Sequence, residues 1–151
     1  MPGARTHLYT HIVFSTKRRA PLIDDDFAEE LHPFLGGIAR DLRCTPHSIG
    51  GMPDHVHLLI RLRSDISIAD LVRHLKGRSS KWANERRAGS LRWQEGYGAF
   101  SVSKSGLAEV VEYISNQKSH HREMSYKQEF EAFLRRNEIE YDPRELWSDE
   151  D

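Results

Sequence analysis

The chain has 151 residues, of which 38% are hydrophobic and 30% are charged, a composition typical of one globular domain and not of a disordered segment. Its single cysteine, Cys44, excludes an internal disulfide and a cysteine-based zinc site. The first residues lack the apolar stretch of a signal peptide, and no segment approaches the roughly eighteen apolar residues of a membrane span. We therefore expect one soluble, cytoplasmic domain over residues 1–151, with no membrane partner.

The net charge of −1 conceals two unequal segments. Residues 61–92 hold nine Arg and Lys against three Asp and Glu, whereas residues 138–151 hold seven acidic residues against one arginine. The basic segment can attract a phosphate backbone, while the acidic segment brings the whole chain close to neutrality. Two solvated faces explain the same pattern equally well, so charge alone does not decide for a nucleic-acid partner.

The predicted elements begin with a strand over residues 7–15, which are rich in β-branched and aromatic side chains. Residues 26–42 carry the three- and four-residue apolar spacing of a core-facing helix. Pro33 and the Gly36-Gly37 pair interrupt this spacing, so we expect a kinked or two-part helix. Residues 45–49 and 54–63 flank a Gly-Gly-Met-Pro sequence and predict a β-hairpin.

Ser67 to Asp70 has the form of a capped helix start, and a second apolar stripe follows it as far as Trp82. Residues 96–103 predict a fourth strand, and residues 107–121 predict a further helix. The order β-α-β-β-α-β-α predicts an α+β fold of the ferredoxin-like split βαβ type, with an additional C-terminal helix that carries Tyr113. In this fold the helices cover one face of the sheet, and the other face is then free for a ligand or partner. We expect residues 126–151 to form a C-terminal tail that packs on the domain.

The most informative side chains lie on the strand predicted over residues 54–63. Strand alternation sends His55 and His57 to one face and the apolar residues between and after them to the other. Residues two apart on a strand are roughly 6.5–7 Å apart, so the two imidazoles can converge on one metal ion. Because a His-x-His sequence arises often by chance, surface or core histidines remain an alternative, and a metal site needs a third ligand.

Tyr113 and Gln117 lie four residues apart on the last predicted helix and therefore share one face. The Gln117 carbonyl oxygen would complete a mixed nitrogen and oxygen ligand set, with the Tyr113 hydroxyl about one helical turn from the metal. From spacing alone, the plainer interpretation is favoured: Tyr113 is an amphipathic contact and Gln117 is solvated.

Three runs of the sequence resemble the motifs of the IS200/IS605-type transposases, which are small nucleases of the His-hydrophobic-His class that use one tyrosine. These runs are MPDHVHLL (52–59), WQEGYGAFSVS (93–103) and YISNQKSHH (113–121). The similarity extends from the HIVF run at residues 11–14 to the Phe133-Leu134 and Tyr141-Asp142 pairs of the tail, so it covers nearly the whole chain. Three separate motifs in one order are far more specific than any one of them.

The resemblance implies a DNA transposase that cleaves and rejoins single-stranded DNA through a 5′-phosphotyrosine intermediate. It implies that His55 and His57 bind a divalent cation, Mg²⁺ or Mn²⁺, that Gln117 is the third ligand, and that Tyr113 is the nucleophile. Imidazole favours softer ions than Mg²⁺, so we expect Mn²⁺ or Zn²⁺ to bind more tightly.

The resemblance also implies a single-stranded DNA partner with hairpin ends, and a homodimer in which the Tyr113 helix of one subunit can complete the histidine pair of the other. Candidate contacts to the DNA backbone are the basic residues Arg18, Arg19, Arg73, Lys76, Lys81, Lys104 and Lys118. Trp93, Tyr97 or Phe100 can stack on unpaired bases, although solvation or core packing explains each of these residues more simply. Two other functions stay open: a domesticated hairpin-DNA nuclease of the same family, and a non-catalytic ferredoxin-like module that binds nucleic acid.

Overall fold

The computed structural model describes residues 3–120 and 124–148. The strands are β1 (Tyr9–Ser15), β2 (Thr45–Met52), β3 (His55–Arg61) and β4 (Gly98–Val102). The helices are α1 (Asp25–Asp41), α2 (Ile68–Arg86), α3 (Leu107–Ser115), α4 (Gln117–His120), α5 (Tyr126–Arg136) and α6 (Pro143–Leu146), with short 3-10 turns η1 (Lys17–Arg19) and η2 (Lys104–Gly106). None of the helices described is both long and apolar enough to cross a membrane.

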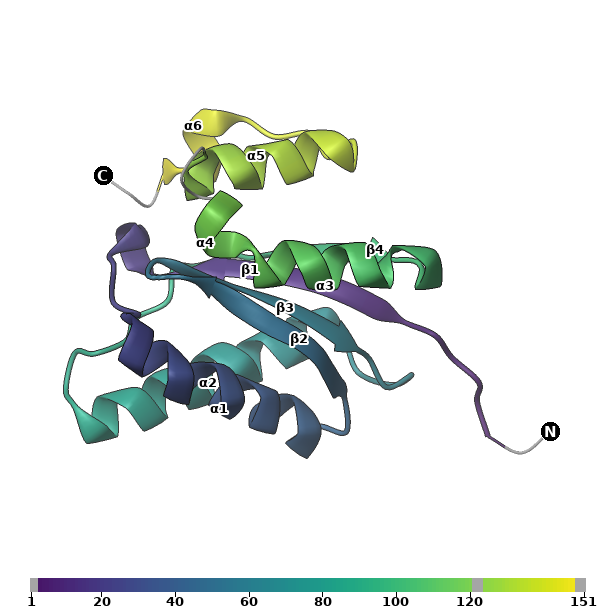
Figure 1. Ribbon diagram of the computed structural model, residues 1–151, viewed down its shortest axis with the longest axis horizontal. Helices are drawn as coiled ribbons and strands as arrows, with labels where there is room; N and C mark the ends of the chain where they lie inside the picture. The colour runs from purple at the N-terminus through teal and green to yellow at the C-terminus, as the bar shows by residue number, and fades with distance from the viewer. Residues whose placement is uncertain (1–2, 121–123, 149–151) are drawn as a thin grey trace.

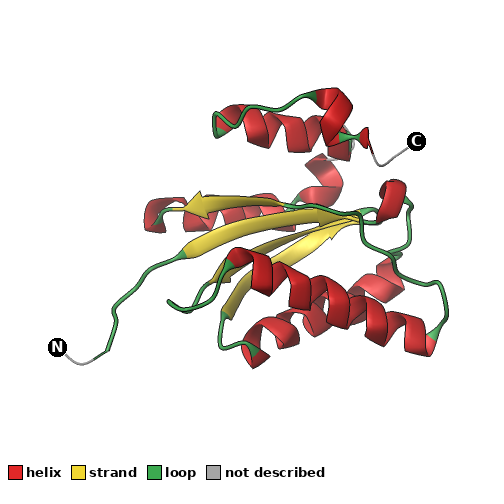
Figure 2. Ribbon diagram, turned by 180° about the vertical axis from the view of Figure 1, so that it is seen from behind, coloured by secondary structure: helices red, strands yellow, loops and turns green. Residues whose placement is uncertain are grey.

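The four strands form one antiparallel sheet in the order β2-β3-β1-β4. Helices α1 and α2 cover one face of the sheet, as Figures 1 and 2 show. This arrangement confirms the predicted α+β fold with its split βαβ order and additional C-terminal helices. The sequence led us to expect that the opposite face is free. That expectation is wrong, because α3, α4, α5 and α6 lie over this face (Figure 1).

Strand alternation divides the buried residues between two cores. The larger core lies under α1 and α2 and takes Ile12 and Phe14 from β1 and the apolar residues Val56, Leu58 and Ile60 from β3. The smaller core lies on the opposite face, where Val13 and Phe100 pack against the aromatic residues of α5. The sheet is therefore a partition between a purely structural layer and the layer that holds the two histidines.

Two helices differ from their predicted form. Helix α1 continues from Asp25 to Asp41 with Pro33 inside it, so it is not divided into two helices; burial of Leu31, Leu35 and Ile38 offsets the backbone bond that the proline loses. The helix predicted over residues 107–121 instead breaks at Asn116, whose φ of −99° and ψ of 19° end α3 before α4 begins.

A close approach between β2 and the end of α3 depends on Gly50. A Cβ atom at this position would lie 2.9 Å from both the Cγ2 atom and the carbonyl oxygen of Ile114. The missing side chain lets the backbone of α3 rest directly on the sheet. Because Ile114 follows Tyr113, this contact sets how deeply the tyrosine reaches over the strand that carries the histidines.

We expect Gly50→Ala to lower the free energy of unfolding by about 1–3 kcal/mol, because the added methyl group forces the end of α3 away from β2. Urea denaturation measures this change. Gly37→Ala is the matched control, since a Cβ atom there meets nothing within 4 Å and a helical alanine should stabilise the protein by about 0.5–1 kcal/mol. Equal effects of the two substitutions would contradict the role given to Gly50.

Candidate metal and tyrosine site

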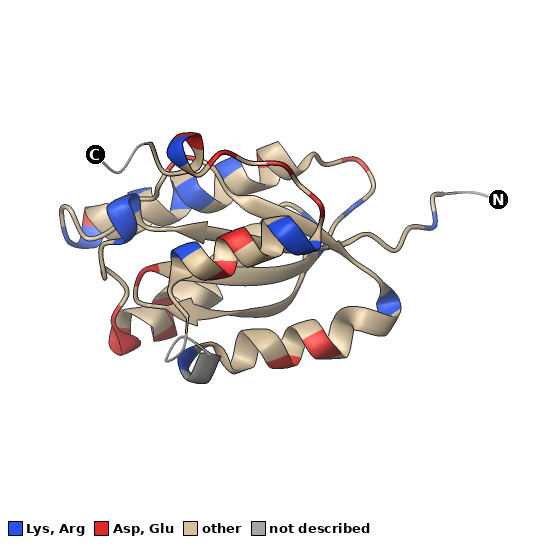
Figure 3. Cartoon of the chain, turned by 90° about the horizontal axis from the view of Figure 1, so that it is seen from above, with Lys and Arg blue, Asp and Glu red and all other residues tan. Residues whose placement is uncertain are grey.

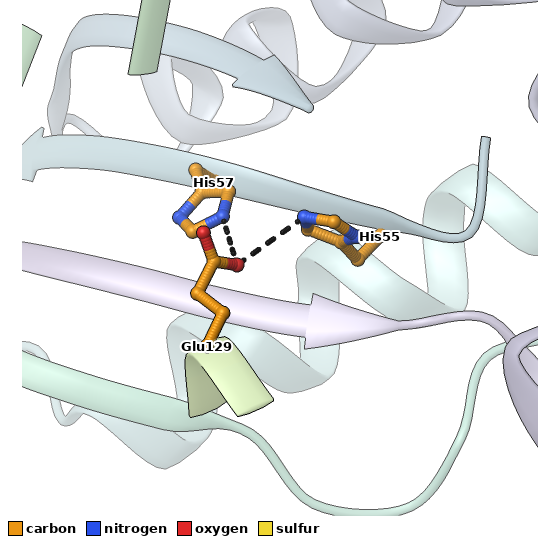
Figure 4. A group of neighbouring side chains, drawn as sticks. All are labelled: His55, His57 and Glu129. Atoms are coloured by element: carbon orange, nitrogen blue, oxygen red, sulfur yellow. Dashed lines mark hydrogen bonds and ion pairs between the residues drawn. The ribbon is translucent and has the colours of Figure 1, made fainter. Parts of the chain in front are cut away.

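The two histidines of β3 point to the face covered by α5, and neither has exposed surface. Glu129 of α5 lies opposite them, with its Oε1 atom 3.0 Å from His57 Nε2 and 3.4 Å from His55 Nε2 (Figure 4). One ligand atom from each of these three residues lies within 4.8 Å of the others. The three side chains therefore form a group with the dimensions of a metal site.

Gln117 and Tyr113 meet the same group from α4 and α3. The Oε1 atom of Gln117 lies 3.0 Å from His55 Nε2, and its Nε2 atom donates to Glu129 Oε2 over 3.2 Å. The Tyr113 hydroxyl also donates to Glu129 Oε2. One chain by itself thus brings together all four residues that the sequence singled out.

Second hydrogen bonds orient both imidazole rings. His55 Nδ1 lies 2.7 Å from Asp54 Oδ1, and His57 Nδ1 lies 2.8 Å from His11 Nε2. Burial, with the neighbouring His57, lowers the pKa of His11 to about 3, so that its ring is neutral. If His57 donates its Nδ1 proton to His11, the Nε2 atom of His57 keeps a lone pair for a metal ion. Such outer partners are typical of metal-binding histidines.

The protonation of the tyrosine follows from its surroundings. Burial raises the pKa of Tyr113 above its usual value, and the hydrogen bond to Glu129 acts in the same direction. The phenol is consequently neutral in this arrangement, and it acts as a hydrogen-bond donor to the carboxylate.

The donor atoms fit a divalent cation. Two imidazole nitrogens, a carboxylate oxygen and an amide oxygen form a mixed set that suits Mn²⁺ or Zn²⁺ better than Mg²⁺. The carboxylate of Glu129 is only 2% exposed, and a buried negative charge is costly unless positive charge or hydrogen bonds offset it. A cation between the histidines and Glu129 would supply that positive charge.

Glu129 is the residue that the sequence-based prediction missed. It lies on α5 three residues after Tyr126 and directly before Phe130, inside the apolar stripe that continues to Phe133. An acidic residue within an apolar helical stripe is the signal that marks it, because an unpaired carboxylate has no reason to face a core.

The basic residues proposed to contact DNA do not share one surface. Lys118 forms an ion pair with Asp25 over 2.8 Å, and Lys104 lies on η2 at the start of α3. Lys81 is exposed on α2, and Arg73 lies on the same helix within 3.4 Å of Asp70.

Lys76 points inward from α2, and its Nζ atom donates to the carbonyl oxygens of Gln94 and Gly96. Burial lowers its pKa to about 8, an effect that Glu95 opposes, so Lys76 is still largely protonated at neutral pH. Arg18 and Arg19 form the η1 turn next to the same segment.

Residues 4–117 match the family model described as "Transposase IS200 like". The chain belongs to the IS200-like transposase family. It is 29% identical over 127 residues to the ISDra2 transposase TnpA of Deinococcus radiodurans, a match that covers 78% of this chain and 91% of that protein. His55, His57, Tyr113 and Gln117 lie within the residues matched by the family model, whereas Glu129 follows them.

Two solved structures resemble this fold. A crystal structure from Deinococcus radiodurans R1, described as that of a transposase, has a TM-score of 0.63 and 29% sequence identity and covers 78% of this chain and 95% of its own. A REP-associated tyrosine transposase bound to a REP hairpin has a TM-score of 0.59 and 17% identity, over 80% of this chain and 74% of its own. The second likeness concerns the fold alone.

We expect Mn²⁺ at a hundred times its dissociation constant to stabilise the protein by about 2.7 kcal/mol, which raises Tm by roughly 5–10 °C for a chain of this size. A His55→Ala/His57→Ala protein should lose this shift. Glu129→Gln should reduce it because a neutral amide oxygen replaces a negatively charged carboxylate oxygen, and Gln117→Ala should reduce it because it removes an oxygen ligand. Differential scanning fluorimetry with and without Mn²⁺ measures the shifts.

The control for this titration is His47→Ala, which removes an exposed histidine of β2 and should leave the shift unchanged. A full Mn²⁺ shift in the double histidine variant would show that the cation binds elsewhere.

Proposed function

We propose that this chain is a metal-dependent DNA transposase that cleaves and rejoins single-stranded DNA through a covalent bond to Tyr113. The observation that carries the proposal is the meeting of the Tyr113 hydroxyl, the His55 and His57 pair and Gln117 on one carboxylate, that of Glu129. A nucleophile beside a metal-binding group is the minimum that transesterification of a phosphodiester requires.

In the proposed reaction the Tyr113 Oη atom attacks the scissile phosphorus, and a phosphorus–oxygen bond to the tyrosine forms. The bond to the 3′ oxygen breaks, and the departing strand takes up a proton as a 3′-hydroxyl. Before α5 moves, Glu129 Oε2 accepts the hydrogen bond of the phenol, so it is the group that would take the phenolic proton as the helix is displaced and leave Tyr113 as the phenolate. A bound Mg²⁺ or Mn²⁺ would neutralise negative charge that develops on the phosphate oxygens. Attack of a different 3′-hydroxyl on the phosphotyrosine reverses these steps and joins strands.

Access to Tyr113 requires a movement of α5. The cavity between Tyr113, Glu129 and Phe133 has a volume of about 50 Å³, which is room for a water molecule and not for a nucleotide. Helix α5 carries Glu129, so its displacement would admit the scissile phosphate and at the same time free the Glu129 carboxylate from the tyrosine.

The proposed partner is single-stranded DNA with hairpin ends, in keeping with the family and with the hairpin bound by the REP-associated relative. We propose one domain over residues 1–151 with residues 126–151 as its tail; residues 149–151 lie outside the described part. The contacts of α5 with Val13 and Phe100 support the packing of this tail on the rest of the domain. A homodimer stays a prediction, and the presence of all site residues in one chain favours a site formed within each subunit.

Incubation with a labelled hairpin oligonucleotide that carries single-stranded flanks, in the presence of Mn²⁺, should give a protein–DNA adduct stable on a denaturing gel. Tyr113→Phe should abolish the adduct while DNA binding remains, because the phenyl ring keeps the packing and loses the nucleophile. Tyr141→Phe is the matched control, since the Tyr141 hydroxyl accepts a hydrogen bond from Arg135 and does not contact the histidines. An adduct of undiminished yield with the Tyr113→Phe protein would overturn the proposal.

Mixing two inactive proteins tests where the site is assembled. If each site forms within one chain, Tyr113→Phe mixed with His57→Ala should stay at the level of either variant alone. If the Tyr113 helix serves the partner subunit, the mixture should recover up to about a quarter to a half of the wild-type adduct yield, depending on how the subunits redistribute. Adduct formation after joint refolding measures the difference.

A further inference from the structure

The segment from Arg92 to Tyr97 separates two surface hollows. On one side, a groove of about 560 Å³ lies between this segment and α2, and we name it the α2 groove. On the other side, a hollow of about 270 Å³ lies between the same segment and the tail helices, and we name it the tail hollow. Residues 94–97 line both, so they form a ridge that is common to the two.

The α2 groove combines positive charge with an accessible aromatic ring. Arg73 and Arg92 line it and are exposed, and the only acidic residue among its lining residues is Glu95. Arg73 also lies 3.4 Å from Asp70, and Tyr97 has 39% of its surface exposed at the ridge. Within the ranges that the structure describes, the Arg92 side chain has no hydrogen-bond or ion-pair partner. Lys76 anchors the ridge from below through its bonds to Gln94 and Gly96.

The tail hollow lies between the ridge and the side chain of Tyr126, which contacts His55. Tyr126 lines it and lies with its ring centroid 4.7 Å from that of His55. Trp147 lines it as well, and the cationic groups of Arg19 and Lys127 lie 5.9 Å and 5.3 Å from its ring. Tyr126 therefore lies between the hollow and the candidate metal site. Glu95 and Glu145 line the hollow itself, so its positive charge is confined to the edge beside Trp147.

The η1 turn adds further positive charge beside the ridge. The Arg18 amide donates to Gln94 Oε1, and the Lys17 amide donates to the Arg92 carbonyl oxygen, so the turn and the ridge are joined. Arg18 and Arg19 have φ values of 53° and 56°, in the left-handed region that non-glycine residues seldom occupy. Figure 3 shows Lys and Arg concentrated at this end of the molecule, near the C-terminus.

We propose that the ridge and its two hollows bind the unpaired DNA strand next to the scissile phosphate, with a base stacked on Tyr97 and backbone phosphates held by Arg73 and Arg92. The proposal rests on the proposed function for the identity of this strand. Unpaired bases expose the flat faces that an aromatic side chain can contact, whereas bases within a duplex are already stacked on their neighbours. The tail hollow would carry the strand past Tyr126 toward the site once α5 has moved.

Fluorescence anisotropy of a fluorescein-labelled dT 12-mer, without metal and in a Tyr113→Phe background, tests the subsite by binding alone. Tyr97→Ala should weaken binding of the 12-mer about tenfold, since one base–aromatic stack is lost. Tyr97→Phe should bind within about twofold of the parent, because it keeps the ring. A 12-mer of abasic nucleotides should bind the parent and the Tyr97→Ala protein equally.

Salt dependence tests the phosphate contacts independently of Tyr97. Arg73→Gln and Arg92→Gln should each reduce the slope of log affinity against log salt concentration by about 0.7, the value for one phosphate contact on a single strand. Arg78→Gln is the matched control on the same helix, because Arg78 pairs with Asp41 and does not line the groove. Circular dichroism confirms that each variant is folded.

The subsite would be overturned if the parent had no measurable affinity for the dT 12-mer, or if the parent and the folded Tyr97→Ala protein bound it equally. The subsite would also be overturned if Tyr97→Ala weakened binding of a 12-base-pair duplex as much as binding of the dT 12-mer, since a duplex offers no free base to Tyr97. Failure of the covalent reaction at Tyr113 leaves these binding results unaffected, so the two proposals fail separately.

Discussion

The carboxylate of Glu129 joins every part of the site. One of its oxygens faces both imidazoles of β3, and the other accepts hydrogen bonds from Tyr113 and Gln117. Burying a carboxylate costs several kcal/mol unless it is paired, and Glu129 is only 2% exposed. Helix α5 therefore docks favourably on the sheet only where these partners contact Glu129. The same contacts of Glu129 therefore fix both the position of α5 on the sheet and the geometry of the site.

The sheet separates the demands of stability from those of chemistry. Ile12, Phe14 and the apolar residues of β3 build a conventional core with α1 and α2, which leaves the alternate positions of the same strands to hold His11, His55 and His57. Buried imidazoles are tolerated on that second face because each is hydrogen-bonded at both ring nitrogens or lies against another polar group. Gly50 then lets α3 approach closely enough to bring Tyr113 to them.

The local pattern predicted the sheet and the shared face of the histidines, because a period of two leaves no other arrangement once Val56, Leu58 and Ile60 face a core. The convergence of Tyr113 with the histidines could not be read from periodicity, since it depends on how α3 docks; the family resemblance was needed for it. Glu129 escaped prediction because its partners are distant in sequence and an acidic residue on a short helix is usually solvated.

Charge patterning was a weaker guide than hydrophobic patterning, and Lys76 and Lys118 show why. Both belong to the set expected to contact DNA, yet one donates to backbone carbonyl oxygens and the other pairs with Asp25. A sequence states where positive charges occur, but their availability depends on acceptors that only the fold brings near them. Arg92 has no such acceptor among the described residues, so its charge stays available.

The tail contributes residues both to the candidate metal site and to the proposed strand-binding subsite, so the two are physically linked. Helix α5 supplies Glu129 to the candidate metal site, while Tyr126 of the same helix and Trp147 after α6 line the tail hollow beside the ridge. A strand that enters this hollow competes with the contacts that hold the tail on the sheet, including the packing of Trp147 on Phe130, whose ring centroids are 5.9 Å apart. Binding energy from the unpaired strand can therefore offset the loss of the Glu129 contacts, so that the displacement of α5 required for access to Tyr113 accompanies the arrival of DNA.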